Sequence, residues 1–169
     1  MANLRRAACS PDSAGSGGSG ASGPRPSLVY WHAWVDDAGI SRQTRCTLEN
    51  FELKGINPSV QPQWNLKQDK VPAVVTFSLL PVGWFGDWHE NPGPQWITVL
   101  SGRWYVETMD GTRVEMGPGE IEFGEDQNCR ADSDGRKGHI SGTLGDEPCV
   151  LLVVSIDVEP TRASPCRFT

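Results

Sequence analysis

The sequence predicts an all-β protein, built as an antiparallel barrel or sandwich. Segments rich in aromatic and β-branched residues, each about six residues long, recur roughly every ten residues along the chain. Glycine- and proline-containing turns separate them, and no segment between them carries the apolar repeat of an amphipathic helix. Short strands at this spacing, without intervening helices, are typical of barrels and sandwiches.

The expected strands follow one another along the middle of the chain. Residues 28–35 are rich in aromatic side chains, which favours a strand. Residues 47–53 are a weaker candidate, for a strand or a helical turn, and residues 57–69 contain two prolines and predict a loop. Firmer strands are expected at residues 71–80, 95–100, 103–108, 112–116, 120–123, 139–144 and 149–158. Ser101 and Gly102 predict a tight hairpin, because glycine tolerates the positive φ that a two-residue turn requires.

Length and composition favour one domain with a tail at each end. The chain has 169 residues, of which 37% are hydrophobic and 21% are charged, enough for one modest core. Residues 1–26 are rich in glycine and serine and predict a disordered tail, because ordering them would bury almost no side chain. Residues 27–158 form the expected domain, and residues 159–169, with two prolines, are expected to be a second short tail.

Charge and hydropathy exclude several kinds of partner. The net charge of −6, without a basic block, argues against binding to nucleic acid or to an anionic membrane. No apolar stretch approaches the roughly 18 residues that a membrane span needs. The N-terminus has basic residues but lacks the apolar core of a secretory signal. A cytoplasmic protein is therefore expected, with a weak organelle transit peptide as the alternative.

The cysteines predict free thiols. There are five of them, Cys9, Cys46, Cys129, Cys149 and Cys166, and no two stand in a CxxC pattern. An odd number cannot pair completely within one chain, and this spacing does not suit a zinc knuckle. We therefore expect free thiols in a reducing compartment, with Cys149 buried at the start of an apolar run.

The most specific pattern lies in residues 83–102. Glycine, histidine, asparagine, glutamine and glycine stand at Gly83, His89, Asn91, Gln95 and Gly102. This spacing resembles the first motif of the cupin superfamily, which has glycine, histidine, histidine, glutamate and glycine at those intervals. Residues 110–120 are similar to the strand, turn and strand that follow in cupins, and His139 stands where their last metal-binding histidine would be.

The resemblance implies a cupin jelly-roll barrel, or double-stranded β-helix, with its core at residues 70–157. It also implies a divalent metal site for iron, manganese, nickel or zinc at His89, Gln95 and His139, with Asn91 beside them. The two amides weaken that expectation, because they replace a histidine and a carboxylate and are poor ligands for transition metals. Some cupins work without a metal and use a histidine as base, which implies His89 and His139 as catalytic acid–base residues instead.

Strand alternation supports the same convergence. Residues two apart on a strand project to one side, so His89 and Asn91 are expected to point into the barrel together. Gln95 begins a neighbouring strand after the bend at residues 92–94, and His139 would reach the cavity from a facing strand. In the alternative arrangement, His89 points to solvent from a loop at residues 88–94.

Aromatic and acidic residues surround this pattern. The candidate substrate-binding residues are Trp84, Trp88, Asn91, Trp96 and Tyr105, and the aromatic ones among them would form a wall. Trp88 and Trp96 fit equally well as packing residues on the outside of the barrel or at a dimer contact, and His32 is expected to be packed rather than a ligand. Solvated positions are expected for Asp87, Glu90, Glu125 and Asp126. Gly135 and Gly138 predict a mobile loop before His139 that acts as a lid.

These features together predict a small-molecule enzyme. Imidazole titrates near neutral pH, which suits proton transfer. Without an anionic ligand set, isomerisation, elimination or cyclisation of a hydrophobic or ring-bearing metabolite is favoured over oxygen activation. The alternatives are a cupin that binds a small ligand without turnover and a metal-dependent dioxygenase. Residues 27–56 are expected to add strands to the barrel edge or to exchange with a partner subunit, and the aromatic first strand, which leaves an edge to cover, predicts a homodimer.

Overall fold

The computed structural model describes residues 24–168, so the predicted tail at residues 1–26 lies almost wholly outside it, as does Cys9. The described residues contain strands and no helix, which confirms the all-β prediction. The strands are β1 (Leu28–Val35), β2 (Ser41–Leu48), β3 (Glu52–Lys54), β4 (Gln63–Asn65), β5 (Ala73–Leu80), β6 (Phe85–His89), β7 (Gln95–Ser101), β8 (Arg103–Thr108), β9 (Arg113–Met116), β10 (Ile121–Gly124), β11 (His139–Leu144) and β12 (Cys149–Ile156). Consequently no part of residues 24–168 forms a helix able to cross a membrane.

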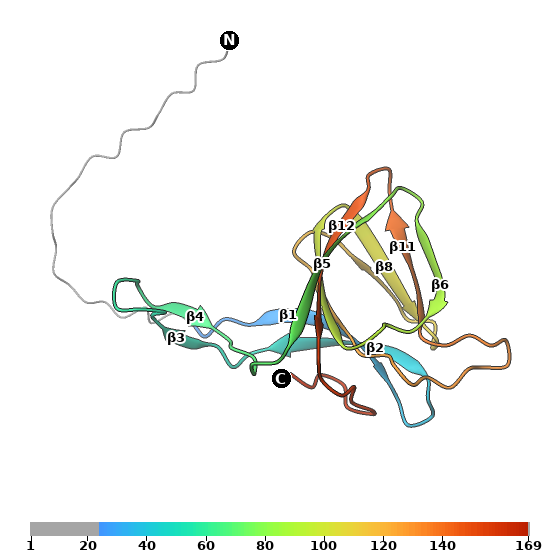
Figure 1. Ribbon diagram of the computed structural model, residues 1–169, viewed down its shortest axis with the longest axis horizontal. Coiled ribbons are helices and arrows are strands. Elements are labelled where there is room, and N and C mark those ends of the chain that lie inside the picture. Colours follow the sequence, from blue (N-terminus) through green and yellow to red (C-terminus); the bar gives the residue numbers. More distant parts are fainter. Residues whose placement is uncertain (1–23, 169) are drawn as a thin grey trace, which may run out of the picture.

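Two sheets form the barrel, as the jelly-roll prediction required. One has six strands in the order β2-β1-β10-β7-β12-β5, and the other has four in the order β6-β11-β8-β9 (Figure 1). Neighbouring strands pair antiparallel, except that β1 runs parallel to β10, with Trp31 opposite Glu122. The residues before β5 therefore extend the six-stranded sheet through β1 and β2, as expected.

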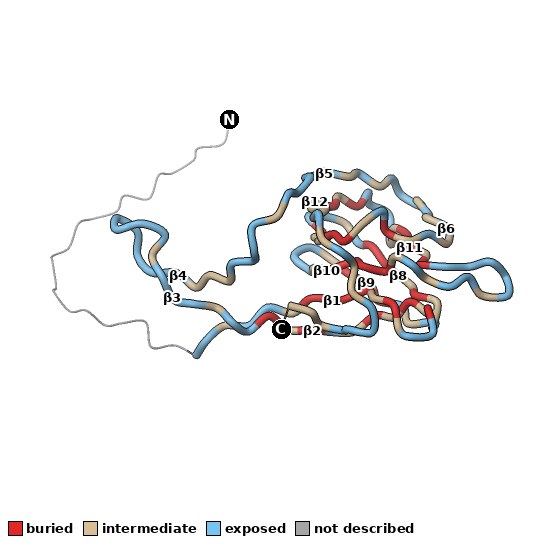
Figure 2. Tube along the Cα trace, turned by 60° about the horizontal axis from the view of Figure 1, so that its bottom comes forward, coloured by how far each residue is buried: buried red, intermediate tan, exposed pale blue. Residues whose placement is uncertain are grey.

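A two-stranded arm projects from the barrel. It consists of β3 and β4, which pair only with each other (Figures 1 and 2). Figure 2 shows the arm as mostly exposed, whereas buried residues concentrate in the barrel. The expected loop at residues 57–69 is therefore interrupted by β4, and the chain returns from the arm directly into β5.

The hairpin between β7 and β8 turns at Ser101 and Gly102, as predicted. Gly102 has a φ of 73°. A Cβ atom there would also lie 2.4 Å from the carbonyl oxygen of Pro148. Two features therefore require glycine at this position: the left-handed backbone conformation and the close approach of Pro148, in the turn between β11 and β12.

Apolar residues pack in two clusters, one on each face of the six-stranded sheet. The interior cluster lies between the two sheets and contains Ile97, Val99, Trp104, Val106, Val114, Met116, Cys149 and Leu151. The second cluster lies on the opposite face and is built around Tyr30, Cys46, Leu48 and Phe123, with Trp96 and Phe168 packed against them. Strand alternation produces this division, because successive side chains point to opposite faces.

The segment at residues 159–168, expected to be a tail, is fastened to the barrel. Cys166 forms a disulfide with Cys46 of β2, and Arg162 pairs with Val35 of β1. The expectation of free thiols is therefore wrong for Cys46 and Cys166. Sequence spacing could not reveal this pair, because 120 residues separate the two cysteines. Cys129 and Cys149 are free, and Cys149 is buried as predicted.

The exposed edge of the barrel differs from the one expected. The aromatic strand β1 lies between β2 and β10, whereas β5 ends the sheet. Although β5 is rich in apolar residues, Phe77 and Leu79 are 71% and 67% exposed. β5 therefore forms an open edge of the sheet with an exposed apolar face.

Candidate functional site

His89, the last residue of β6, and His139, the first residue of β11, lie side by side at one end of the four-stranded sheet. They are opposite each other in the pairing of β6 with β11, and their ring centroids are 4.4 Å apart. His139 is buried and His89 is exposed. The Nδ1 atom of His89 contacts the carbonyl oxygen of Asp87, an acceptor, so Nδ1 carries the hydrogen and Nε2 is left to accept a proton.

A chain of buried hydrogen bonds joins His139 to Asn91 and Gln95 through Asp126. Oδ2 of Asp126 lies 2.6 Å from Nδ1 of His139. Its Oδ1 accepts hydrogen bonds from the backbone N–H and the side-chain amide of Asn91, at 2.9 and 2.7 Å. Oδ1 of Asn91 accepts from Gln95, whose Oε1 accepts from Ser155. Three of the predicted site residues, His139, Asn91 and Gln95, are thus brought together by an aspartate that was expected to be solvated.

The Asp126 and His139 pair is strongly polarised. Burial by itself raises the pKa of Asp126, but the charge and hydrogen bond of His139 and the Asn91 donors hold that pKa below its ordinary value. Burial likewise lowers the pKa of His139, and the Asp126 charge outweighs it, so the net pKa of His139 is raised. The raised pKa favours the imidazolium form of His139, in which Nδ1–H is bound to Asp126 and Nε2–H is a proton donor.

A second buried acid, Glu122 of β10, lies opposite Ile97 on the interior face of the six-stranded sheet. It is fully buried and accepts a hydrogen bond from Gln43 of β2 at 3.0 Å. Burial raises the pKa of Glu122 to about 7; the charge of His139 and the Gln43 bond lower it, and the Asp126 charge raises it. Glu122 was not identified from the sequence. The signal was its position in β10, where alternation places it on the face opposite Phe123.

The loop between β10 and β11 closes beside the histidines and is fastened by Glu90. The Glu90 carboxylate accepts hydrogen bonds from the backbone of Cys129 at 2.7 Å and from Lys137 at 3.1 Å. Gln127 donates to the backbone oxygen of Asn91. Glu90 was expected to be solvated, and instead it ties this loop to the end of β6.

Of the expected aromatic wall, Trp84 lies at the histidines. A Cβ atom at Gly86 would meet Trp84, His89 and Ser141 within 3.1 Å, so these three side chains surround the glycine. Trp88 is half-buried, and the guanidinium of Arg136, from the neighbouring loop, lies 5.7 Å from its ring centroid. Trp84 therefore lies beside His89, with both side chains at Gly86.

Trp96 and Tyr105 lie away from the histidines. Trp96 follows Gln95 and points to the opposite face, where it packs against Phe123 and Phe168. Tyr105 stands between Trp104 and Val106, which are both in the interior cluster, so its ring faces outward under Arg113. Because adjacent side chains on a strand point to opposite faces, the sequence could have shown that Trp96 and Tyr105 face away from the site.

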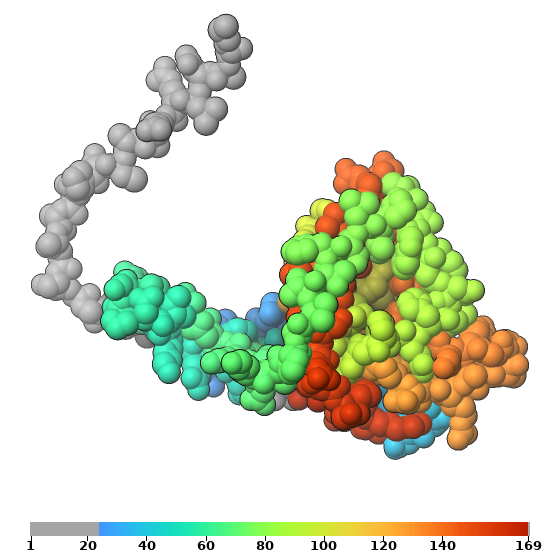
Figure 3. All heavy atoms as spheres, in the orientation of Figure 1, coloured from blue at the N-terminus to red at the C-terminus, as the bar shows by residue number. Residues whose placement is uncertain are grey.

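The barrel interior opens to solvent next to Gln95. Val74 of β5 is opposite Ser155, which is opposite Gln95, so the three share the interior face. Val74 is nevertheless 65% exposed. Figure 3 shows the molecule hollowed between β5 and β6, on the side where this face opens. The interior face around Val74 is therefore open to solvent on that side.

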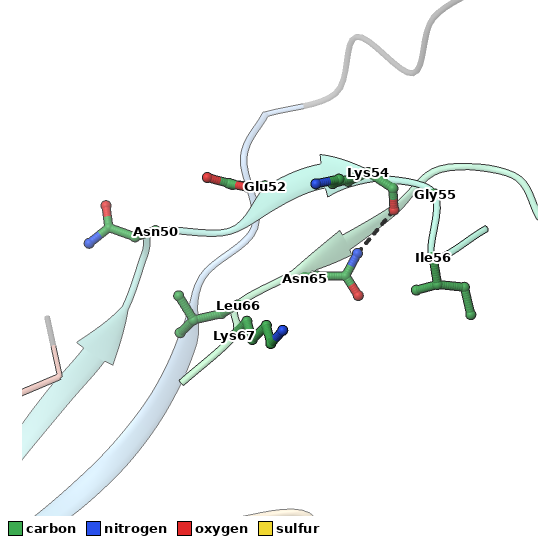
Figure 4. Close-up of a pocket in the computed structure, with 8 residues that line it drawn as sticks. All are labelled: Asn50, Glu52, Lys54, Gly55, Ile56, Asn65, Leu66 and Lys67. Atoms are coloured by element: carbon green, nitrogen blue, oxygen red, sulfur yellow. Dashed lines mark hydrogen bonds between the residues drawn. The ribbon is translucent and has the colours of Figure 1, made fainter. Parts of the chain in front are cut away.

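A separate cavity of about 560 Å³ lies in the arm. It is lined by Asn50, Glu52, Lys54, Gly55, Ile56, Asn65, Leu66 and Lys67 (Figure 4). Asn65 donates a hydrogen bond to the backbone oxygen of Lys54 at its edge. Its charged lining residues are Glu52, Lys54 and Lys67, and none of the histidines or buried acids of the barrel lines it.

The donor set does not fit the metal site that the resemblance implies. The oxygens of Asn91 and Gln95 already accept hydrogen bonds, and Nδ1 of His139 is bound to Asp126. Two imidazole Nε2 atoms remain, whereas open transition-metal sites need three protein ligands. Within residues 24–168, no group of three or more histidine, cysteine or acidic side chains is arranged to hold a metal ion.

Comparison with known proteins finds similarity only among solved structures. No protein-family model matches the chain, and no curated protein matches it. A sugar phosphate isomerase of the cupin superfamily from Silicibacter pomeroyi is 19% identical, with a TM-score of 0.39, and the match spans 51% of each chain. The cupin domain of Cnp3 from Schizosaccharomyces pombe is 14% identical, with a TM-score of 0.39, and the match covers 78% of this chain and 88% of that one.

A cupin protein from Bacteroides fragilis is 14% identical, with a TM-score of 0.33, and the match covers 68% of this chain and 92% of that one. Similarity of this degree does not transfer an activity. The structural neighbours of this chain are thus cupin superfamily proteins, at low sequence identity.

Proposed function

We propose that the protein is a small-molecule enzyme that uses His139 and His89 as an acid–base pair at the open side of the barrel. The observation that carries this proposal is the buried Asp126 carboxylate, 2.6 Å from Nδ1 of a histidine whose ring lies 4.4 Å from a second, exposed histidine. A carboxylate on Nδ1 fixes the tautomer and holds the ring in place, as in other histidine acid–base sites.

The two histidines differ in the way that a proton-transfer reaction needs. Asp126 favours the imidazolium form of His139, whose Nε2–H suits a general acid. His89 has its Nδ1 hydrogen occupied by a backbone oxygen, so its Nε2 lone pair suits a general base. One group that removes a proton and one that delivers it are the requirements of isomerisation, elimination and cyclisation.

The surroundings favour a substrate with an apolar or ring-shaped part. Trp84 offers an aromatic surface beside His89, and Val74 and Val153 lie on the interior face near the polar chain. The amides of Asn91 and Gln95 hold each other and Asp126 rather than a metal. We therefore propose metal-independent proton transfer on a hydrophobic or ring-bearing metabolite.

Ligand binding without turnover is the second candidate. The specific observation in its favour is that Asn91 and Gln95 stand where the resemblance calls for a histidine and a carboxylate, so the site lacks two reactive groups. The same hollow and Trp84 would then bind the ligand, while the two imidazoles only donate and accept hydrogen bonds.

The experiment screens ring-bearing metabolites by thermal shift and then incubates the stabilising compounds with the protein in D₂O. An acid–base enzyme converts a bound compound or incorporates solvent deuterium at a C–H position, both visible by NMR. His139→Gln should abolish turnover and exchange while leaving binding largely intact, and Tyr105→Phe on the outer face is the matched control that should leave turnover unchanged. A tight ligand that is neither converted nor deuterated favours the binding protein. Turnover that survives His139→Gln contradicts the proposed mechanism.

A further inference from the structure

The C-terminal strap, defined as residues 159–168, lies across the outer face of the six-stranded sheet. Cys166 joins it to Cys46 of β2, and this is the only disulfide within residues 24–168. The backbone N–H of Ala163 donates to Val35 of β1. Phe168 packs on Trp96 and Phe123, with ring centroids 5.1 and 4.8 Å apart.

The strap supplies most of the partners of a buried carboxylate, Glu125. Glu125 is fully buried. It accepts hydrogen bonds from the backbone N–H of Thr161 at 2.9 Å, from the Thr161 hydroxyl at 2.6 Å and from Arg167 at 2.6 Å. Its remaining partner is His32 of β1, whose Nε2 lies 2.8 Å away. Nδ1 of His32 in turn accepts from the backbone N–H of Cys166. Without the strap, a buried charge would lose three of its four partners.

Glu125 is the residue immediately before Asp126, and the two carboxylates point in opposite directions. Glu125 faces the strap, whereas Asp126 faces Asn91 and His139. The backbone N–H of Glu125 is held by Ala33 of β1. The strap and the histidine site therefore share one short stretch of backbone, and a change in the position of Glu125 reaches Asp126 directly.

The strap has a conformation that its contacts must hold in place. Ala163 and Cys166 have φ angles of 49° and 62°, in the left-handed region that residues with a Cβ atom rarely adopt. Cys46 is buried, whereas Cys166 is half-buried. Cys166 is thus the more exposed residue of the two, and its side of the disulfide is the one we expect a reductant to approach.

We propose that the Cys46–Cys166 disulfide is a redox latch, whose reduction by a dithiol releases the C-terminal strap and loosens Asp126 behind His139. Any effect of the latch on catalysis rests on the function proposed above, whereas the structural change does not. This makes the strap a regulatory element that acts through a residue of the site.

The chemistry of opening is a thiol–disulfide exchange. A thiolate of the dithiol attacks the Cys166 sulfur, the bond between the two protein sulfurs breaks, and Cys46 leaves as a thiolate that takes up a proton. The second thiol of the reductant then attacks the mixed disulfide and releases Cys166 as a thiol. Two electrons and two protons pass to the protein, and the reductant becomes a cyclic disulfide.

The test compares hydrogen–deuterium exchange of the oxidised protein and the protein reduced with dithiothreitol, with thiols counted by alkylation and mass spectrometry. No substrate is needed, so the result is independent of the proposed function. Reduction should accelerate exchange by about tenfold or more in residues 159–168 and also in residues 122–126, while β8 and β12 keep their protection. Cys46→Ser should show the same pattern without reductant and should not respond further to dithiothreitol, which separates the disulfide from Cys129 and Cys149.

Two results would overturn the proposal. Exchange that rises in the strap but not in residues 122–126 would mean that Glu125 does not transmit the change. Exchange that rises equally in all strands would mean that the disulfide stabilises the whole barrel and is not a latch.

Discussion

Replacing Asp126 with asparagine keeps the shape of the side chain but removes its charge and one of its acceptor atoms. The carboxylate accepts two hydrogen bonds from Asn91 at Oδ1 and one from His139 at Oδ2. An asparagine whose oxygen keeps the two Asn91 bonds turns its NH₂ group toward Nδ1 of His139. His139 must then leave Nδ1 unprotonated and carry its hydrogen on Nε2, so the variant holds the neutral ring and disfavours the imidazolium form proposed as the acid.

The magnitude follows from the geometry of the pair. Two unit charges 2.6 Å apart attract by about 6 kcal/mol at an effective dielectric constant near 20. Desolvation of both buried groups offsets part of this attraction, and removing one partner of a buried pair costs about 3–5 kcal/mol. We expect Asp126→Asn to lower the free energy of unfolding by that amount near pH 6.

The difference between the two proteins should depend on pH in a defined direction. Because the folded pKa of His139 is raised, its contribution is fully present below the ordinary histidine pKa of about 6.5 and is lost as the pH rises through the raised value. Because the folded pKa of Asp126 is lowered, its contribution is lost only as the pH falls through that lowered value. The stabilisation by the pair is therefore largest between these two pKa values and declines on the alkaline side.

Urea unfolding of both proteins across the range from about pH 5 to pH 9 measures this difference. Asp134→Asn, the same substitution at an exposed position in the loop before His139, is the matched control and should leave the free energy of unfolding nearly unchanged. A loss below about 1 kcal/mol, or a loss that stays constant over the whole pH range, would refute the polarised pair.

Three further outcomes are expected. Glu122→Gln should remove a fall in stability that the wild type shows between about pH 4.5 and pH 7, because burial raises the pKa of this acid to about 7. In urea unfolding at pH 8, the free energy of unfolding of the variant should exceed that of the wild type by roughly 3 kcal/mol. A variant whose stability depends on pH as the wild type's does would contradict this role of Glu122. Cys46→Ser should free the strap while the barrel strands stay folded, so calorimetry should find a loss well below the roughly 5 kcal/mol that a cross-link closing a loop of 120 residues supplies at most; a loss of that full size would show that the disulfide stabilises the whole barrel. We predict a homodimer through the exposed β5 face, so light scattering should give a dimer mass for the wild type and a monomer mass for Phe77→Glu; a monomeric wild type or a dimeric mutant would contradict this contact.

Strand positions and the central site residues could be predicted because they depend on nearby residues. Apolar alternation placed most of the barrel strands, and the spacing of His89, Asn91 and Gln95 brought three donors to one region. The same alternation would have separated Trp96 from Gln95 and Tyr105 from its neighbours, since adjacent residues on a strand face opposite sides. The local sequence pattern thus predicted the strands of the barrel and three residues of the candidate site.

The tertiary structure alone decided which distant groups meet. Asp126 and Glu125 look like a solvated acidic run in the sequence, yet one is buried against His139 and the other against the C-terminal strap. Cys46 finds Cys166 because the strap lies across β2, not because of any spacing between them. Buried charges and long-range pairs depend on how sheets and loops pack together, and a linear pattern of neighbours contains no information about that packing.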